Sequence, residues 1–357
     1  MEEPKKVIIQ PRFVLTKRKD SVETGCAGAS PRASETRPSI GHGGTYGLKR
    51  KGNMRIAVVG LGGVGGFFGG KIGLKYAGLL GHRVVFVARG EHLEAIRGEG
   101  LILRTVEGNF RIKPDLATDD PTAVGPCDLV LFCVKEYALD EAAAGISPLL
   151  GANTVVLPLL NGVDIAERLR SLLPHGVVLS GCVYISSFIE APGVVHQVGG
   201  SCQLFFGPDD GRTEAFRPFE KLLQGAGIQA ELTDRIGMHL WTKYLFVSPM
   251  AGVTSLTAKS FGAVMADEQA RAMVRGLMEE IGLLAKANGI ALPADSVEAA
   301  LAKVVRFPDE TKSSMQLDYE KGRRTEIDLF IGYAVRAGRS LGVPVPLHDK
   351  LYAKLKR

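Results

Sequence analysis

The chain has 357 residues, a length that suits two domains better than one small domain. Hydrophobic residues make up 45% and charged residues 23%, a globular composition that excludes a mostly disordered chain. The net charge of +6 comes entirely from residues 1–53, which hold 11 Lys and Arg against 5 Asp and Glu. Because residues 54–357 are electrically balanced, a nucleic-acid-binding function is disfavoured.

The first 53 residues are rich in Ser, Gly, Lys and Arg and show no hydrophobic periodicity. We expect a disordered basic extension over residues 1–53, and a targeting or tethering tail is the alternative interpretation. The five cysteines form no CxxC pair, which favours a reduced, cytoplasmic protein. No apolar stretch reaches about 18 residues without a charge, so we expect no transmembrane helix and no membrane partner.

A dinucleotide-binding pattern begins directly after residue 53. Residues 56–59 form a short apolar run typical of a buried strand. A GxGxxG sequence follows, then a helix-length stretch and a second strand over residues 83–88. In such a βαβ unit the first glycine permits a tight turn, the second lets the backbone approach a pyrophosphate, and the third allows the helix to pack closely. We therefore expect phosphate contacts from Gly60, Leu61, Gly62, Gly63, Val64 and Gly65, at the N-terminus of the helix.

The residue after the second strand bears on the choice of cofactor. NAD sites carry an acid there, whereas this chain has Arg89, whose planar fork suits the 2′-phosphate of NADPH. An exposed loop arginine is the alternative. Two further buried strands are predicted at 128–134 and 154–157, and Lys135 and Asn161 follow their carboxyl ends, where open α/β sheets bind ligands. A solvated lysine and a turn asparagine are the alternatives for these two positions.

After Asp234 the pattern becomes helical, with predicted helices over 238–256, 265–289 and 313–341. The sequence thus predicts a Rossmann-type α/β domain over 54–233 and an all-α domain over 234–357, with the active site between them. Lys243 lies in a strongly apolar helix, where desolvation lowers the pKa of an ammonium and suits it to proton donation. A lysine that extends to the helix edge is the alternative. Ser314, Asp318 and Glu326 would lie near one face of the last predicted helix. An ordinary charged helix surface is the alternative.

Together these features resemble the ketopantoate reductase family, also called 2-dehydropantoate 2-reductase, from Met54 to the end of the chain. The resemblance rests on GLGGVG, on LLNG at 159–162, on the Lys243 helix, and on SSMQLDYEKGRRTEID at 313–328. It implies a Rossmann-type domain followed by a helical domain like the C-terminal domain of 6-phosphogluconate dehydrogenase. The implied reaction is the NADPH-dependent reduction of 2-dehydropantoate to pantoate, in pantothenate biosynthesis on the route to coenzyme A.

The resemblance also implies roles for individual residues. Lys243 would be the general acid, and Glu326 would hold the substrate hydroxyl, help to position the lysine and contact the cofactor. Ser314 would bind the substrate carboxylate, and we expect Asp318 on the same face to contact the substrate as well. Asn161 would lie near the nicotinamide and the ketone, and Lys135 would contact the cofactor.

The chain departs from the family pattern at three positions. Family members often carry asparagines four and eight residues after the lysine, where this chain has Val247 and Ala251, and a glutamine at the position of Ala138. Each lost hydrogen bond weakens recognition of a polyhydroxylated acid by roughly 0.5–1.5 kcal/mol. The substrate could therefore be another 2-keto acid, and a dinucleotide-binding sensor without turnover is a further alternative.

A hydroxyacid or opine dehydrogenase is disfavoured by the order Lys243 then Glu326 along the chain. The seven histidines are scattered and none has HxxxH spacing, so we expect no metal requirement. The long apolar helices leave a homodimer open.

Overall fold

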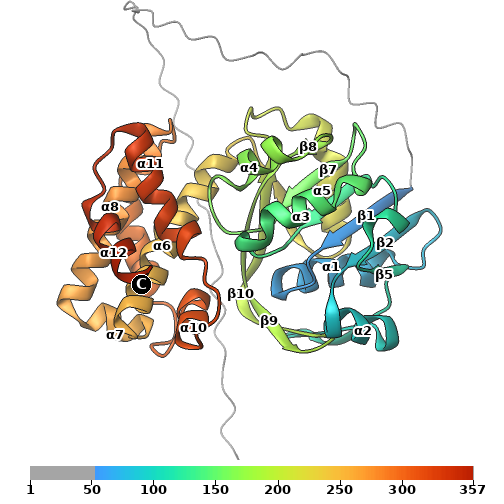
Figure 1. The fold of residues 1–357 in the computed structure, drawn as a ribbon, viewed down its shortest axis with the longest axis horizontal. Coiled ribbons are helices and arrows are strands. Elements are labelled where there is room, and N and C mark those ends of the chain that lie inside the picture. The colour runs from blue at the N-terminus through green and yellow to red at the C-terminus, as the bar shows by residue number, and fades with distance from the viewer. Residues whose placement is uncertain (1–52, 357) are drawn as a thin grey trace, which may run out of the picture. The chain divides into compact units, whose positions relative to one another are not determined.

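The computed structural model describes residues 53–356, which belong to one compact unit, Tyr46–Arg357. The predicted extension over 1–53 lies outside the described residues except for Asn53. The described chain is an α/β half followed by a helical half, as predicted (Figure 1). The last strand ends at Leu232 and the first long helix begins at Ile236.

The α/β half is built on a six-stranded sheet in the order β5-β2-β1-β6-β7-β8, in which all neighbouring strands are parallel. Its central strands read as continuous apolar runs because both faces of a parallel sheet are covered. The strands predicted at 56–59, 83–88, 128–134 and 154–157 are confirmed, with small shifts at their ends. The six are β1 (Met54–Val59), β2 (His82–Val87), β5 (Leu116–Thr118), β6 (Leu129–Phe132), β7 (Val155–Pro158) and β8 (Val177–Val178).

Helices and short 3₁₀ turns connect these strands. The first helix is rich in glycine, which lets neighbouring elements approach its backbone: a Cβ at Gly66 would lie 2.5 Å from the side chain of Val195. Apolar residues of this helix, such as Phe68 and Ile72, are fully buried against the sheet. The helices are α1 (Gly63–Tyr76), α2 (Gly90–Glu99), α3 (Leu139–Gly145), α4 (Ile165–Leu172) and α5 (Arg217–Gly225), and the turns are η1 (Pro121–Ala123), η2 (Glu136–Ala138), η3 (Ser147–Leu149) and η4 (Glu214–Phe216).

A second sheet, which the sequence did not predict, has the order β11-β10-β3-β4, with β9 paired to β10. Residues 176–183 and 202–206 fall in β8 and in one long antiparallel hairpin of β9 and β10. The hairpin shifts register near Gly199, which interrupts the alternation by which strands are recognised. The strands are β3 (Leu101–Thr105), β4 (Gly108–Ile112), β9 (Ser180–Ala191), β10 (Val194–Gly207) and β11 (Gln229–Leu232).

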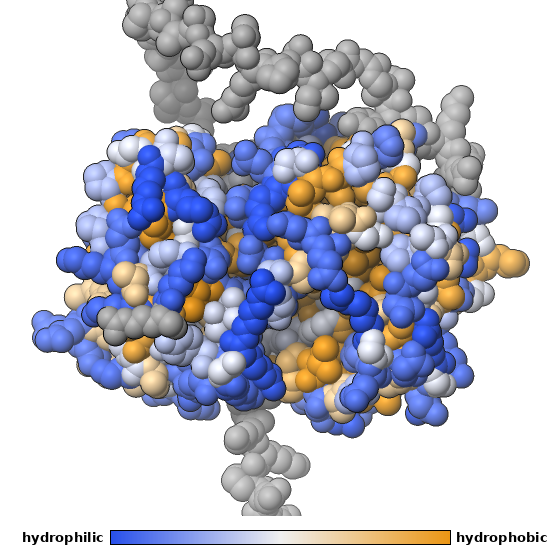
Figure 2. Space-filling view, viewed as in Figure 1, coloured by the Kyte–Doolittle hydropathy of each residue, from blue (hydrophilic) through white to orange (hydrophobic). Residues whose placement is uncertain are grey.

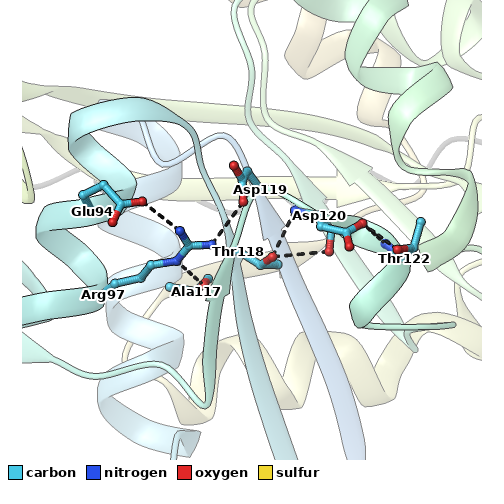
Figure 3. A network of polar contacts seen from close by, with 7 residues as sticks. All are labelled: Glu94, Arg97, Ala117, Thr118, Asp119, Asp120 and Thr122. Atoms are coloured by element: carbon cyan, nitrogen blue, oxygen red, sulfur yellow. Dashed lines mark hydrogen bonds and ion pairs between the residues drawn. The ribbon is translucent and has the colours of Figure 1, made fainter.

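The edge strand β5 is fixed to α2 by the guanidinium of Arg97, which donates to the carbonyl of Ala117 and pairs with Glu94 and Asp119 (Figure 3). In the turn that follows, the backbone N–H of Asp120 donates to Thr118 Oγ1 at 2.9 Å. These contacts satisfy the backbone where the edge strand ends. Strand β5 pairs in parallel with β2, after which Arg89 follows.

The helical half gathers α6 to α12, which Figure 1 draws in colours from yellow through orange to red. Its core is apolar, with Leu277, Ile281 and Phe330 almost completely buried. The helices predicted at 238–256 and 265–289 are confirmed. The elements are α6 (Ile236–Thr257), α7 (Phe261–Ala266), α8 (Glu268–Ala287), α9 (Ser296–Val304), α10 (Ser314–Glu320), a π-helical turn η5 (Asp328–Gly332), α11 (Tyr333–Leu341) and α12 (Pro346–Leu355).

The prediction of a single long helix over residues 313–341 is wrong. Helix α10 ends at Glu320, and Gly322 takes the left-handed conformation with φ +61°. The N–H of Arg323 donates back to the carbonyl of Asp318 at 2.9 Å, as in a Schellman ending, so the chain leaves the helix axis here. The proximity of Asp318 and Glu326 therefore comes from a turn rather than from spacing along one helix.

No helix among residues 53–356 is long and apolar enough to cross a membrane. On the face shown in Figure 2, hydrophobic residues form separate patches among hydrophilic ones.

Candidate active site

The glycine-rich loop joins β1 to α1 at the carboxyl edge of the parallel sheet. Gly60 turns with φ +89°, and its N–H donates to Val87 at 3.0 Å. A Cβ at Gly65 would collide with the carbonyl oxygen of Gly60, so only glycine allows this approach of helix and strand. Gly62, where an added Cβ would meet no heavy atom within 4 Å, is the N-cap of α1, and no side chain caps that helix end. This open, uncapped helix N-terminus fits a pyrophosphate, with Leu61, Gly63 and Val64 completing the loop.

Arg89 follows β2 and is the N-cap of α2. Its guanidinium is exposed and forms an ion pair of 2.6 Å with Glu141 of α3. An exposed pair of this kind contributes at most about 1 kcal/mol, so a stronger anion such as a phosphate can replace Glu141. The arginine is thus accessible at the sheet edge where the sequence places the adenosine end of a cofactor.

Lys135 lies just beyond β6 and contacts the helical half. Its Nζ is 3.0 Å from Glu326 Oε2 and 3.7 Å from Asp318 Oδ2. Burial acts to lower the pKa of Lys135, but the charge and hydrogen bond of Glu326 and the charge of Asp318 overcome it and raise that pKa. Glu326 itself is only 5% exposed. The three residues thus join the sheet edge to the segment 318–326, although 191 positions separate Lys135 from Glu326.

A second contact joins the end of β7 to α6. Lys243 Nζ donates to Asn161 Oδ1 at 2.7 Å. Burial lowers the pKa of the Lys243 ammonium, and the charges of Cys182 and Glu326 oppose this shift only in part. An ammonium with a lowered pKa, held by an amide oxygen, is suited to donate a proton near neutral pH.

Buried polar contacts that the sequence did not reveal hold α6 in this position. The hydroxyls of Tyr244 and Ser248, on the turns after Lys243, both donate to the backbone carbonyl of Phe330. Phe330 lies in the π-helical turn η5, which leaves this carbonyl free to accept them. Helix α6 is therefore docked on the segment that directly follows Glu326.

A small cavity lies beside the Lys243 ammonium. Its volume is about 10 Å³, room for about one water molecule. A keto acid therefore needs side chains, or the two halves, to move before it can bind here. Val247 lines this cavity, whereas Ala251 is buried and Ala138 ends η2. The other lining residues are mostly apolar: Leu160, Asn161, Gly162, Cys182, Leu240, Tyr244 and Phe330.

Ser314 stands apart from these contacts. It is the first residue of α10, is exposed, and forms no side-chain hydrogen bond with the residues described. Its neighbour Ser313 caps the helix, accepting from the N–H of Gln316 at 3.1 Å and pairing with Thr254 at 3.0 Å. The structure thus joins Lys135 with Asp318 and Glu326, and Asn161 with Lys243, but does not join Ser314 to either group. Within residues 53–356, no cluster of three or more His, Cys, Asp or Glu side chains could hold a metal ion.

Comparison with known families gives two matches that span most of the chain. Residues 56–211 match the ketopantoate reductase PanE/ApbA family model, and residues 236–357 match the model of the ketopantoate reductase PanE/ApbA C-terminal domain. The order of the two matches follows the order of the α/β and helical halves.

Individual relatives cover the same region. The chain is 30% identical to an uncharacterized oxidoreductase, YkpB, of Bacillus subtilis, over 85% of this chain and 98% of that protein. It is also 30% identical to a 2-dehydropantoate 2-reductase of Mesorhizobium japonicum, over 85% of this chain and 97% of the relative. A crystal structure of a PanE/ApbA family ketopantoate reductase from Ralstonia eutropha is similar with a TM-score of 0.77 and 34% identity, over 85% of this chain and 97% of that one.

Proposed function

The chain belongs to the ketopantoate reductase family of oxidoreductases, and from this premise we propose that it reduces the ketone of 2-dehydropantoate to pantoate with NADPH. The observation that carries the proposal is the half-buried Lys243 ammonium, held by Asn161 at the carboxyl edge of the sheet. A proton donor is what the reduction of a ketone requires. We place the domain boundary between residues 233 and 234, where β11 gives way to α6.

Lys243 is the general acid of the proposed reaction. Bound NADPH supplies the hydride that is added to the ketone carbon. The negative charge that develops on the ketone oxygen is stabilised by the Lys243 ammonium, which then donates its proton to that oxygen. Asn161 Oδ1 accepts a hydrogen bond from Lys243 Nζ at 2.7 Å, and this contact holds the ammonium beside the cavity.

Glu326 and Lys135 connect the cofactor to the substrate in this proposal. Glu326 opposes the lowering of the Lys243 pKa by its charge and would hold the substrate hydroxyl. Lys135, now paired with Glu326, would contact the cofactor once the cleft is filled. Asp318 and Ser314 would contact the substrate, Ser314 through its exposed hydroxyl.

The choice of NADPH over NADH rests on Arg89, whereas the glycine-rich loop would serve either cofactor. The open N-terminus of α1 at Gly62 fits the pyrophosphate shared by both cofactors. Arg89 is exposed at the end of β2, and its fork can bind the 2′-phosphate that only NADPH carries. The glycine-rich loop and Arg89 both lie in the α/β half, so neither feature needs a contact from the helical half.

A second candidate function is the reduction of a different 2-keto acid. Val247 lines the cavity and Ala251 is buried nearby on α6, so two positions that often carry substrate-binding asparagines are apolar here. A less hydroxylated keto acid would lose fewer hydrogen bonds in such a site. The catalytic roles of Lys243 and Glu326 would stay the same.

The test follows NADPH oxidation by purified protein with 2-dehydropantoate and a panel of other 2-keto acids. Preference for 2-dehydropantoate supports the proposal, and preference for another acid reassigns the substrate but keeps the reaction. If no acid is reduced while NADPH still binds, the proposed function is wrong and a non-catalytic dinucleotide sensor takes its place.

A further inference from the structure

A second lysine lies close to the proposed general acid. Lys303 is in the last turn of α9, and its Nζ is 4.6 Å from the centroid of the Tyr184 ring and 5.1 Å from that of Phe246. Lys243 Nζ is 5.8 Å from the centroid of the same Tyr184 ring. Two ammonium groups from separate helices therefore share one aromatic side chain of β9.

The Lys303 ammonium has aromatic contacts but no acidic partner. Among residues 53–356 it forms no hydrogen bond or ion pair with a carboxylate. The rings of Tyr184 and Phe246 stabilise a cation by only about 0.5–2 kcal/mol each. Glu326, whose charge acts on Lys243, is already paired with Lys135 at 3.0 Å. A partly buried cation is thus left without a carboxylate partner among the residues described.

Both lysine charges act on the wall of the cavity. Burial lowers the pKa of Lys303, and the charge of Lys243 lowers it further. Burial raises the pKa of the Cys182 thiol, while the charges of Lys243 and Lys303 oppose that shift. Cys182 lines the cavity beside Lys243. The field of Lys303 therefore reaches the place where the keto acid would bind.

We propose that Lys303 is a substrate-binding residue that holds the carboxylate of the 2-keto acid whose ketone faces Lys243. This inference rests on the proposed function. In a 2-keto acid the carboxylate is bonded directly to the ketone carbon, so a substrate presents both groups to neighbouring cations. The bound carboxylate offsets the repulsion between the two ammonium groups, and the aromatic side chains exclude water from the contact.

Lys303 supplies something that the other proposed contacts lack. Ser314 is polar but uncharged, so its hydroxyl cannot balance the charge of a carboxylate. Val247, next to Phe246 on α6, offers no hydrogen bond at all. A cation at position 303 would compensate for part of the substrate affinity that is lost because Val247 and Ala251 cannot form hydrogen bonds through their side chains.

The experiment compares Lys303→Met with a matched control, Arg306→Met. Arg306 is an exposed cation three residues further along the same segment. We expect Lys303→Met to raise the KM for the preferred 2-keto acid by about 10- to 100-fold, because one charge-assisted hydrogen bond is lost. The kcat should be nearly unchanged. Lys303→Arg should recover part of the affinity, and Arg306→Met should behave like the parent protein.

A purely structural lysine, one that only stabilises the C-terminal end of α9, is distinguished by a neutral substrate. The amide of the same 2-keto acid has the ketone but no carboxylate, so its kcat/KM should be the same in the parent protein and in Lys303→Met. An equal loss for the acid and the amide, or an unchanged KM for the acid, would overturn the inference while leaving the proposed function intact. If the parent protein reduces no 2-keto acid, the proposed function fails, and this inference fails with it.

Discussion

The proposed cofactor-binding part and the proposed catalytic part of the site are built in different ways. The cofactor part depends on backbone geometry within six consecutive residues, Gly60 to Gly65, at one strand end. The proposed catalytic part depends on contacts between distant side chains: Lys243 lies 82 positions from Asn161, and Glu326 lies 191 positions from its partner Lys135. A change at Lys243, for which no cofactor contact is proposed, should therefore affect turnover without affecting cofactor binding.

The largest expected effect is that of Lys243→Ala. Without the ammonium, the developing alkoxide has neither a stabilising charge nor a proton donor, and kcat should fall by about 10²–10⁴-fold. NADPH affinity, measured by the fluorescence of the bound nucleotide, should stay unchanged because the glycine-rich loop is intact.

The matched control for this change is Lys350→Ala, at an exposed lysine of α12. It should leave both turnover and NADPH affinity unchanged. Turnover that survives Lys243→Ala would show that another group donates the proton.

The second prediction concerns Arg89 and separates the two cofactors. Arg89→Ala should weaken NADPH binding by about 10- to 100-fold, because a charge-assisted contact to the 2′-phosphate is lost, and should leave NADH binding as it was. Binding of both nucleotides is measured by titration. Glu141→Gln is the matched variant: it removes the competing partner of Arg89, so NADPH should bind at least as tightly as before. An equal loss for both nucleotides would mean that Arg89 does not read the phosphate.

The difference between the two parts also decides what could be predicted from the sequence. The βαβ unit was predictable because a strand, a GxGxxG and a helix are local patterns. The carboxyl ends of parallel strands meet at one edge, so Lys135 and Asn161 could be placed there without knowing their partners. The contact of Lys243 with Asn161, by contrast, depends on how α6 packs against the sheet, and no local pattern encodes it.

Two features of the fold were not predictable for physical reasons. Residues 313–341 are rich in helix formers, so the periodicity continues across a turn that only the left-handed φ of Gly322 reveals. The second sheet was missed because β3 pairs with the distant β10, and because the β3–β4 hairpin is partly exposed, which weakens its apolar alternation. The role of the Phe330 carbonyl was missed for the same reason as the turn, since the sequence predicts a regular helix where the π-helical turn lies.

The third prediction concerns the scaffold of the helical half. Glu280 of α8 is buried and accepts from the backbone N–H groups of Leu347 and His348, at 2.8 and 3.0 Å, and its Oε2 is 2.6 Å from His348 Nδ1. Burial acts to raise the pKa of Glu280, but these hydrogen bonds overcome it and lower that pKa below the ordinary 4.5. A carboxylate with a lowered pKa stabilises the fold above the unfolded-state pKa. Its contribution is lost as the pH falls below about 4.5 toward the folded-state pKa.

Glu280→Gln should lower the free energy of unfolding by about 1–3 kcal/mol near neutral pH, because a charged acceptor of three hydrogen bonds is replaced. Between pH 6 and pH 3, roughly the range over which a carboxylate titrates, its unfolding free energy should also change less than that of the parent protein. Urea unfolding at several pH values measures both effects. Glu279→Gln, at the exposed neighbouring residue, should change neither quantity. A similar pH dependence in Glu280→Gln and the parent protein would show that Glu280 does not control acid stability.

The smallest expected effect belongs to the turn that brings Glu326 to Lys135. Gly322→Ala places a Cβ in the left-handed region at φ +61°, where no neighbouring atom lies within 4 Å, so only backbone strain opposes the substitution. We expect a loss of about 1 kcal/mol in the free energy of unfolding. Gly282→Ala is the matched control, because Gly282 lies within α8 and a Cβ there also has no neighbour within 4 Å. Alanine favours a helix interior, so this variant should gain about 0.5–1 kcal/mol. If Gly322→Ala lowers the free energy of unfolding and Gly282→Ala raises it, the end of α10 is set by Gly322. If both variants raise it, the segment can continue as a helix.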